Sequence, residues 1–577
     1  MSEVCGEQAG RLLYECVLIY GMWILAMYKK NDPVNGRQNE VKRINSWSAL
    51  GVSSVSILLI VLSLGCGTTA TKSGSSSANS AKSANSAADS QPTEALTEAP
   101  TNASGTESAG KIEEESWEVF LMEGEKIGHS HTTIRQLEEP TGKLREIVSD
   151  SRTALKRFGQ TVESNVKISS WEKLDGTMVR FASTMSNPPV EMITQGQLEN
   201  QLLRIEQTTL GKTQKMAMPW DPAWGGYFAQ EQSLRQKPLE PGEKRTLKAL
   251  APIFNQPSEI RLVAEQYEAT KLLDRTEELL RVDVTVQLGN VPIQSVIWTD
   301  RQGQTQKTLL TAQGWESYRT TRDVALTPSS PGRFDLGNAT LVRVQRQIDN
   351  PHQTQRIVYR VKLKGRNPAD VFASGGTQQV TKIDDETAEI EVRSVRDPRM
   401  DAEPGTEPVG DQDRQPNNLI QSDDPRIMEM ARDVLPEEKD PWKVALALER
   451  WVEQKVRVTQ FSQALATASD VAQSLEGDCT EHAVLLAALC RARQIPARVA
   501  LGLVYYRQAG GFAYHMWTEV WVHGHWLPLD GTLGQGGIGA AHVKVSSGNL
   551  EGVAAYTALL PVLELLGKLQ LEIVTVE

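Results

Sequence analysis

Cysteine is scarce in this chain. Among 577 residues there are five cysteines, and Cys5, Cys16 and Cys66 lie in or before an apolar N-terminal stretch. Only Cys479 and Cys490 remain for the folded body, eleven residues apart in one apolar segment. On a helix they would be about 16 Å apart, whereas a disulfide needs Cα atoms within about 7 Å. We therefore expect no disulfide between them.

The sequence also lacks a long basic stripe and any Cys/His cluster with zinc spacing. The formal net charge of −11 supports solubility and argues against general nucleic-acid binding. His129 and His131 are two residues apart on a predicted strand, as metal ligands can be, but this spacing is more typical of two polar surface positions. We expect no metal, no cofactor and no nucleic-acid partner.

The N-terminal segment has the pattern of an export signal. A basic pair at residues 42–43 precedes "ALGVSSVSILLIVLSLG", which ends at Cys66. The ending "SLGC" resembles a bacterial lipoprotein box, in which the cysteine is lipidated, although Ser63 and Leu64 depart from the usual residues. An uncleaved membrane anchor is the alternative. Both readings predict an exported protein that is attached to a membrane of the cell envelope.

Composition and periodicity divide the rest of the chain. Residues 67–110 consist mainly of Ser, Ala, Thr, Asn and Gly and can bury too little apolar surface to fold. Further on, Asp-Gly at 175–176 lies between two runs of alternating apolar and polar residues, which predicts a β-hairpin. After a polar stretch the period changes from 2 to 3.6, and two Asp-Pro pairs mark helix starts. The predicted divisions are an anchor (1–66), a linker (67–116), one or two antiparallel β units (117–400), a linker (401–420) and an α+β domain (421–577).

One short motif places Cys479 at a reactive position. Asp478 and Glu481 have the spacing of a capping box, which makes Cys479 the first residue of a helix. Unpaired backbone N–H groups and the helix dipole favour a thiolate there. The two neighbouring carboxylates oppose this effect, so a base is required. Cys490 and His482 are interpreted as a packing residue and a polar surface residue of the same helix.

A predicted hairpin supplies the base. In "HMWTEVWVHGHWLPLDGT" a two-residue turn at His523-Gly524 places Trp517 opposite Asp530. His515 then shares a face with Asp530 and lies diagonal to it, within reach of a hydrogen bond. A carboxylate that accepts from one ring nitrogen orients the other toward the thiol. A three-residue turn would move Asp530 to the opposite face.

"GDCTEHAVLLAALCRARQIPARVALG", "HMWTEVWV" and "HWLPLDGT" together resemble the three motifs of the transglutaminase-like superfamily, a branch of the papain-like fold. The resemblance covers residues 420–577 and departs at Gly531, where the family often has proline. It implies that Cys479 is the nucleophile, His515 the base and Asp530 the orienting carboxylate. The backbone N–H of Cys479 and, with less support, Gln473 are candidates for the oxyanion site.

The expected function is therefore that of an exported cysteine enzyme that acts on amide bonds of a protein or peptide through an acyl-enzyme. The breadth of the family favours hydrolysis over cross-linking. The alternative is a non-catalytic binding or scaffolding protein with a transglutaminase-like domain. The complete set of Cys479, His515 and Asp530 favours the enzyme.

Overall fold

The computed structural model describes most of the chain after residue 110. The described residues are 111–577, with gaps at 141, 158–159, 188–189, 210–211, 290, 312–313, 329–333, 397–406, 459–465 and 552–559. The predicted anchor, Cys66 and nearly all of the first predicted linker lie outside these residues. Within the described part, no helix has both the length and the apolar character needed to cross a membrane.

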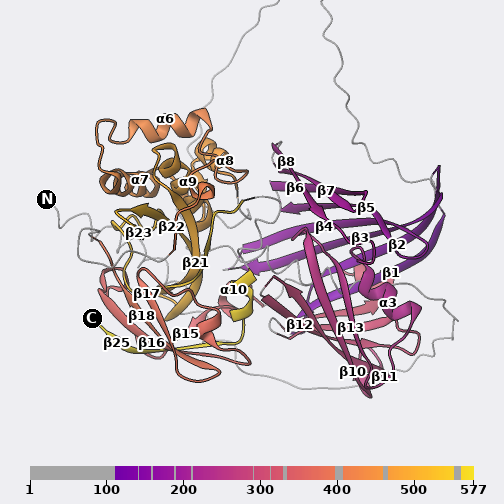
Figure 1. Cartoon of the computed structure of the whole chain (residues 1–577). Coiled ribbons are helices and arrows are strands. Elements are labelled where there is room, and N and C mark those ends of the chain that lie inside the picture. Colours follow the sequence, from indigo (N-terminus) through magenta and orange to yellow (C-terminus); the bar gives the residue numbers. More distant parts are fainter. Residues whose placement is uncertain are drawn as a thin grey trace, which may run out of the picture. The chain divides into compact units, whose positions relative to one another are not determined.

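Fourteen antiparallel strands form one large sheet (Figure 1). The first eight are β1 (Ile112–Met122), β2 (Glu125–Glu139), β3 (Gly142–Arg157), β4 (Gln160–Lys173), β5 (Met178–Asn187), β6 (Val190–Glu199), β7 (Leu202–Thr209) and β8 (Lys212–Pro219). The other six are β9 (Lys244–Ala251), β10 (Gln256–Lys271), β11 (Thr276–Leu288), β12 (Val291–Thr299), β13 (Thr305–Leu310) and β14 (Trp315–Thr320).

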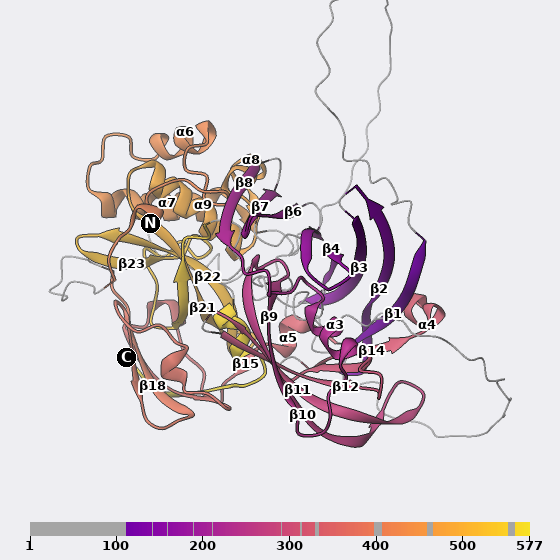
Figure 2. The same ribbon diagram turned by 45° about the vertical axis from the view of Figure 1, so that its right-hand side comes forward.

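The order of this sheet follows the sequence. Consecutive strands pair from β1 through β8 and again from β9 through β14, and β1 pairs with β14 to join the two runs. Strands β8 and β9 are the two edges of the sheet. Figure 2 shows β1 to β4 side by side and strongly curved. Tight turns explain this order: Gly124 and Gly176 have φ of +77° and +91°, which glycine adopts without strain.

One element of this region is absent from the pattern read in the sequence. Helix α3 (Ala229–Gln236) lies between β8 and β9 and contacts β9. Leu234 on this helix is fully buried, in a cluster with Leu262 and Val282 of the sheet. This helix has only eight residues, which is too short for a helical period to stand out between the predicted strands on either side.

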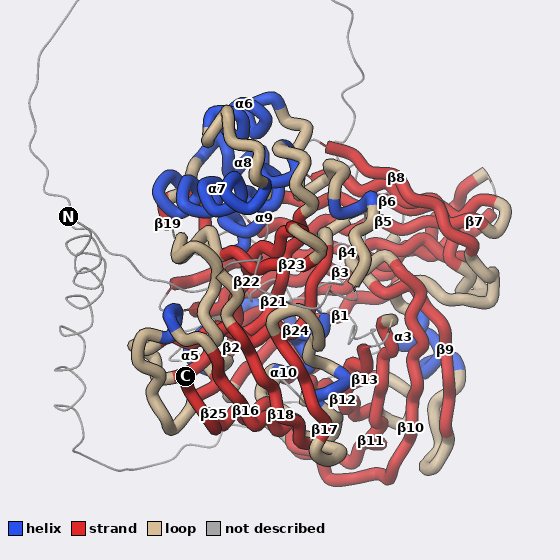
Figure 3. Tube along the Cα trace, turned by 60° about the vertical axis from the view of Figure 1, so that its left-hand side comes forward, coloured by secondary structure: helices blue, strands red, loops and turns tan. Residues whose placement is uncertain are grey.

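The helices of the C-terminal region begin where the sequence predicts. They are α6 (Pro425–Asp433), α7 (Pro441–Lys455), α8 (Ala468–Ser474) and α9 (Cys479–Ala492). The carboxylates of Asp424 and Asp440 accept backbone N–H bonds as N-caps of α6 and α7, and each is followed by proline. Figure 3 shows these helices gathered together, and α9 contacts α6, α7 and α8.

Two smaller sheets complete the described fold. The first has the order β15 (Val342–Arg343), β22 (Gly511–Val522), β21 (Ala497–Tyr506) and β24 (His542–Gly548), with β23 (His525–Leu529) also paired to β22. The second has the order β17 (Gln378–Lys382), β18 (Thr387–Arg393), β16 (Arg356–Leu363) and β25 (Leu569–Val576). The other short helices are α4 (Arg322–Leu326), α5 (Leu336–Ala339) and α10 (Leu560–Leu565), together with the 3-10 helices η2 (Pro351–Gln353), η3 (Pro368–Asp370) and η4 (Asp411–Asp413). The two-residue strands β19 (Arg457–Val458) and β20 (Glu476–Gly477) pair with each other.

Strand pairing links residues on the two sides of the predicted 401–420 linker. Tyr359 in β16 is opposite Ile573 in β25, and Val342 in β15 is opposite Phe512 in β22. The division of the chain into domains stays a prediction, and these pairs give a reason to move its boundary upstream. The fold class itself is confirmed: an antiparallel β region precedes an α+β C-terminal region.

Candidate active site

Helix α9 starts with a complete capping box. The Asp478 side chain accepts from the backbone N–H of Thr480 at 2.8 Å, and Glu481 accepts from the backbone N–H of Asp478 at 2.9 Å. Glu481 also accepts from Ala466 N–H at 3.0 Å, and it is buried. Burial and the nearby Asp478 carboxylate raise the pKa of Glu481 well above its usual range. Cys479 is thus fixed as the first helical residue, as the sequence predicted.

Both cysteines of α9 are buried, and Cys490 is a free cysteine. The expectation that these two cannot pair is confirmed. Burial raises the pKa of the Cys490 thiol, so this residue stays protonated and inert.

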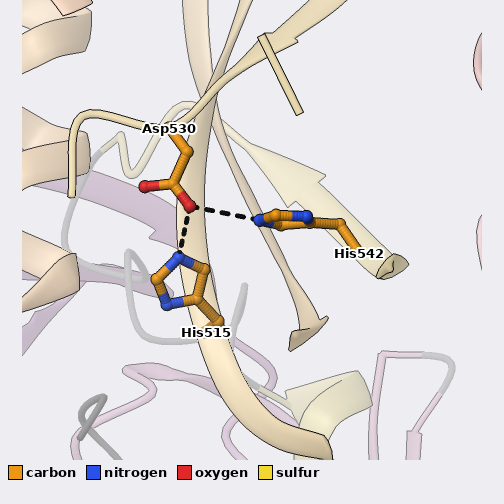
Figure 4. Close-up of side chains that lie close together, drawn as sticks. All are labelled: His515, Asp530 and His542. Carbon is orange, nitrogen blue, oxygen red and sulfur yellow. Dashed lines mark hydrogen bonds and ion pairs between the residues drawn. The ribbon is translucent and has the colours of Figure 1, made fainter. Parts of the chain in front are cut away.

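The hairpin has the two-residue turn on which the prediction depended. Val522 on β22 is opposite His525 on β23, and Thr518 is opposite Leu529, the last residue of β23. Asp530 follows directly after this strand. Nε2 of His515 lies 2.7 Å from Oδ2 of Asp530, and both side chains are about 1% exposed (Figure 4). An ionised carboxylate only accepts, so this ring nitrogen is the donor. The structure therefore brings these two predicted residues together.

The Asp530 carboxylate is fully engaged. Oδ2 accepts from His515 and also from Nε2 of His542 at 3.1 Å, and Oδ1 accepts from the backbone N–H groups of Thr532 and Leu533 at 2.8 and 3.3 Å. Burial opposes ionisation, but the charge and hydrogen bond of His515 and the bond from His542 hold the pKa of Asp530 well below its usual range. The carboxylate is ionised at neutral pH.

The first turn of α9 lies next to this carboxylate in the fold. A β-carbon at Gly531 would lie 3.4 Å from the carbonyl oxygen of His482 and 3.0 Å from Cγ1 of Val452. A β-carbon at this position would require Val452 to move by a few tenths of an ångström. His482 is one turn along α9 from Cys479, and the charge of Asp530 acts on its ring. Cys479 and Asp530 are thus brought to the same part of the fold.

His482 itself corrects the sequence reading. It was expected on the polar surface, but it is 1% exposed, with Nδ1 2.6 Å from Asp478 O and Nε2 3.3 Å from Val456 O. Burial lowers its pKa despite these partners. The periodicity of α9 could not reveal this, because nearly every residue of the helix is buried.

Glu449, on α7, holds the segment that carries Asp530. Its carboxylate accepts from the backbone N–H groups of Asp530 and Gly536 at 2.9 Å and from Gly537 at 3.2 Å. Burial raises the pKa of Glu449 to about 7, although these three N–H groups oppose the shift. No pattern in the sequence indicates this role, because Glu449 has the spacing of an ordinary charged residue on an amphipathic helix.

His542 is the other residue that the sequence reading missed. It starts β24 and is 1% exposed. His515, Asp530 and His542 each offer one ligand-type atom, and these atoms lie within 4.8 Å of one another. The same atoms are already joined by hydrogen bonds, which an ion would have to break. We therefore describe the three side chains as a hydrogen-bonded group.

The remaining candidates have simpler surroundings. Gln473 is exposed on α8. His131 stacks on Trp117 with ring centroids 4.0 Å apart, and its Nε2 lies 2.8 Å from a Glu115 oxygen. The lipidation candidate, Cys66, lies outside the described residues.

Comparison with known proteins identifies one region. Residues 428–531 match the model of the transglutaminase-like superfamily, and no curated protein matches the chain. A solved structure named "Putative Cysteine Protease", from Cytophaga hutchinsonii, has 17% identity and a TM-score of 0.26, covering 39% of this chain and 89% of its own. A β-barrel-like protein with a domain of unknown function, from Brucella abortus, has 10% identity and a TM-score of 0.27, with coverages of 36% and 94%. The residues that match the transglutaminase-like superfamily model include Cys479, His515 and Asp530.

Proposed function

We propose that this protein is a cysteine enzyme that acts on amide bonds, with Cys479 as nucleophile, His515 as general base and acid, and Asp530 as the orienting carboxylate. The observation that carries the proposal is the buried 2.7 Å bond between His515 and Asp530 beside the first turn of α9. A buried histidine held by a carboxylate, next to a cysteine at a helix N-terminus, is the arrangement that activates a thiol.

The reaction divides into two steps. Nε2 of His515 is bound to Asp530, so Nδ1 takes the proton of Cys479 and the thiolate attacks the amide carbonyl. The C–N bond breaks, His515 protonates the leaving amine, and the acyl group remains as a thioester on the sulfur. Water then attacks the thioester, with His515 as base, and releases the acid and the thiol. An amine in place of water would give transfer instead of hydrolysis.

The surroundings of Cys479 and His515 support these roles. The backbone N–H of Cys479, at the start of α9, can bind the oxyanion that forms in each step. Asp530 stays ionised and stabilises the imidazolium that forms when His515 takes the proton. The substrate we propose is a protein or peptide, and hydrolysis is the expected outcome.

Trapping the acyl-enzyme tests this proposal. The chain, reduced with a phosphine, is mixed with peptide esters and glutamine-containing peptides and quenched in acid, and its intact mass is measured. We expect a mass increase equal to the acyl group, located on Cys479 by fragmentation and absent in Cys479→Ser. Cys490→Ser is the matched control and should acylate normally. Acylation that persists in Cys479→Ser would contradict the assignment of the nucleophile.

Export and membrane attachment remain proposals from the sequence alone. The support is the basic and apolar segment that ends at Cys66. A reporter fused after residue 110 should be active outside the cytoplasm, and Cys66→Ser should release the protein from membranes if the cysteine is lipidated. Activity of the reporter confined to the cytoplasm would contradict export.

A further inference from the structure

A second imidazole binds the carboxylate that orients His515. His542 lies at the start of β24, opposite Val504 of β21, whereas His515 lies on β22. Nε2 of His542 is 3.1 Å from Oδ2 of Asp530, the same oxygen that accepts from His515 (Figure 4). Two strands and the end of a third therefore meet at one oxygen atom.

The surroundings of His542 fix its tautomer. An ionised carboxylate only accepts hydrogen bonds, so Nε2 of His542, 3.1 Å from Oδ2 of Asp530, carries the proton. A proton on Nε2 is bound by Asp530. Burial lowers the pKa of His542 against the opposing effect of Asp530, so the ring is neutral and donates through Nε2.

The ring is held in place by packing as well as by this bond. It lies edge-on to Trp517 at a centroid distance of 5.4 Å and next to His352 at 5.8 Å. Its backbone N–H donates to Gly539 O at 3.4 Å. Trp517 is itself 1% exposed. A side chain fixed from several sides can hold its partner carboxylate in one orientation.

We propose that His542 is a positioning residue that shares the Asp530 carboxylate with His515 and so limits how strongly that carboxylate stabilises the His515 imidazolium. This inference rests on the proposed function. Each N–H that binds Oδ2 withdraws charge from it, so loss of one donor leaves more charge for the other. Without His542, the imidazolium of His515 would be more stable and would release its proton less readily to the leaving amine.

Several other titratable groups face this site from neighbouring elements. They are His352 before β16, His482 on α9, Glu449 on α7 and Arg396 after β18, whose charge acts on His352. Glu449 has its pKa raised by burial to about 7, so it changes charge in the working range. Variants that differ only at residue 542 keep all these groups, so a difference between their pH profiles of Cys479 reactivity reports on residue 542 alone.

The experiment compares His542→Leu, which removes the donor, with His542→Gln, whose amide nitrogen reaches the position of Nε2. The rate of Cys479 alkylation by iodoacetamide is measured from pH 4 to 9 in the reduced chain, together with kcat for a substrate that acylates Cys479. We expect His542→Leu to move the rise of the alkylation profile to lower pH and to lower kcat several-fold. His542→Gln should retain the profile and kcat of the unmodified chain.

Different outcomes separate the two proposals. If Cys479 of the unmodified chain reacts no faster than a model thiol, the proposed function fails. If it reacts fast and the His542→Leu profile is superimposable on it, only the role of His542 is overturned. Should His542→Leu fail to fold, His542→Asn takes its place, because its shorter amide does not reach Oδ2. Equal behaviour of the Asn and Gln variants would then overturn the inference.

Discussion

The 14-stranded sheet and the C-terminal region are built in different ways. In the sheet, almost every strand pairs with its neighbour in sequence, and the β1–β14 pair is the exception. In the C-terminal region, β25 pairs with β16 more than 200 residues away, and Asp530 is held by Glu449 and His542 from other elements. The sheet is a product of local turns, whereas the site exists only when distant segments meet.

One buried polar group from each region shows a second contrast, between neutral and charged partners. In the sheet, Ser149 shares hydrogen bonds with Ser130 at 3.1 Å and Thr132 at 3.3 Å, and all three are neutral hydroxyls. In the C-terminal region, Glu519 is buried between Lys544 and Arg498, at 2.7 and 2.8 Å. Neutral pairs tolerate the loss of a partner, but a buried charge without a partner is costly.

The largest expected effect concerns the boundary of the C-terminal region. A fragment of residues 421–577 lacks β16, the strand that pairs with β25, and also lacks β15, which pairs with β22. We expect it to lack a cooperative thermal transition, whereas a fragment of residues 336–577 should melt cooperatively. Circular dichroism against temperature measures both. Cooperative melting of the shorter fragment would show that the predicted boundary at 421 is correct.

A pair of substitutions compares the buried polar groups. Glu519→Gln leaves Lys544 and Arg498 without a full counter-charge, and we expect a loss of about 3 kcal/mol in the free energy of unfolding. Ser149→Ala removes neutral hydrogen bonds in the sheet and should cost about 1 kcal/mol. Denaturant titration of the whole chain measures each change. Equal losses in the two variants would contradict the contrast between neutral and charged buried groups.

The smallest expected effect is the pH dependence that His352 contributes. Burial, followed by the nearby His542, lowers the pKa of His352 from 6.5 to about 4. Between these two values the unfolded chain therefore binds more protons than the folded chain. The contribution of neutral, buried His352 to the stability of the fold is present above pH 6.5 and is lost as the pH falls toward 4. His352→Gln should reduce the loss of stability between pH 7 and pH 5 by ~1–2 kcal/mol.

Denaturant titration at the two pH values measures this difference. Other groups titrate in the same range, since burial also lowers the pKa of His482 and His542, so the comparison is between variant and unmodified chain. An unchanged pH dependence in His352→Gln would show that His352 is protonated as easily in the folded chain as in the unfolded one.

The contrast between the regions explains what the sequence could predict. The capping box at Asp478 and Glu481 and the turn at Asp175-Gly176 depend on residues a few positions apart, and both are found. The pairing of His515 with Asp530 was also predictable, because one hairpin carries both residues. The turn length was the assumption on which it depended.

Other features of the site had no local signal. Glu449 and His542 contact Asp530 only because α7 and β24 pack beside the hairpin, and neither residue lies in a motif. His542 also lies outside the matched residues 428–531. The burial of His482 follows from the helices around α9, which the pattern of α9 itself does not encode.

The central claim is that His515 activates Cys479, and the alkylation rate of Cys479 at pH 6 tests it most directly. The chain is reduced with a phosphine and treated with iodoacetamide, and mass spectrometry follows each cysteine. His515→Gln retains an N–H donor toward Asp530 but has no second ring nitrogen to accept the proton. We expect Cys479 to react more than about tenfold faster than a model thiol and His515→Gln to abolish this advantage. The buried Cys490 should stay unmodified in both. If Cys479 reacts at the rate of the model thiol, and His515→Gln leaves that rate unchanged, the account is contradicted.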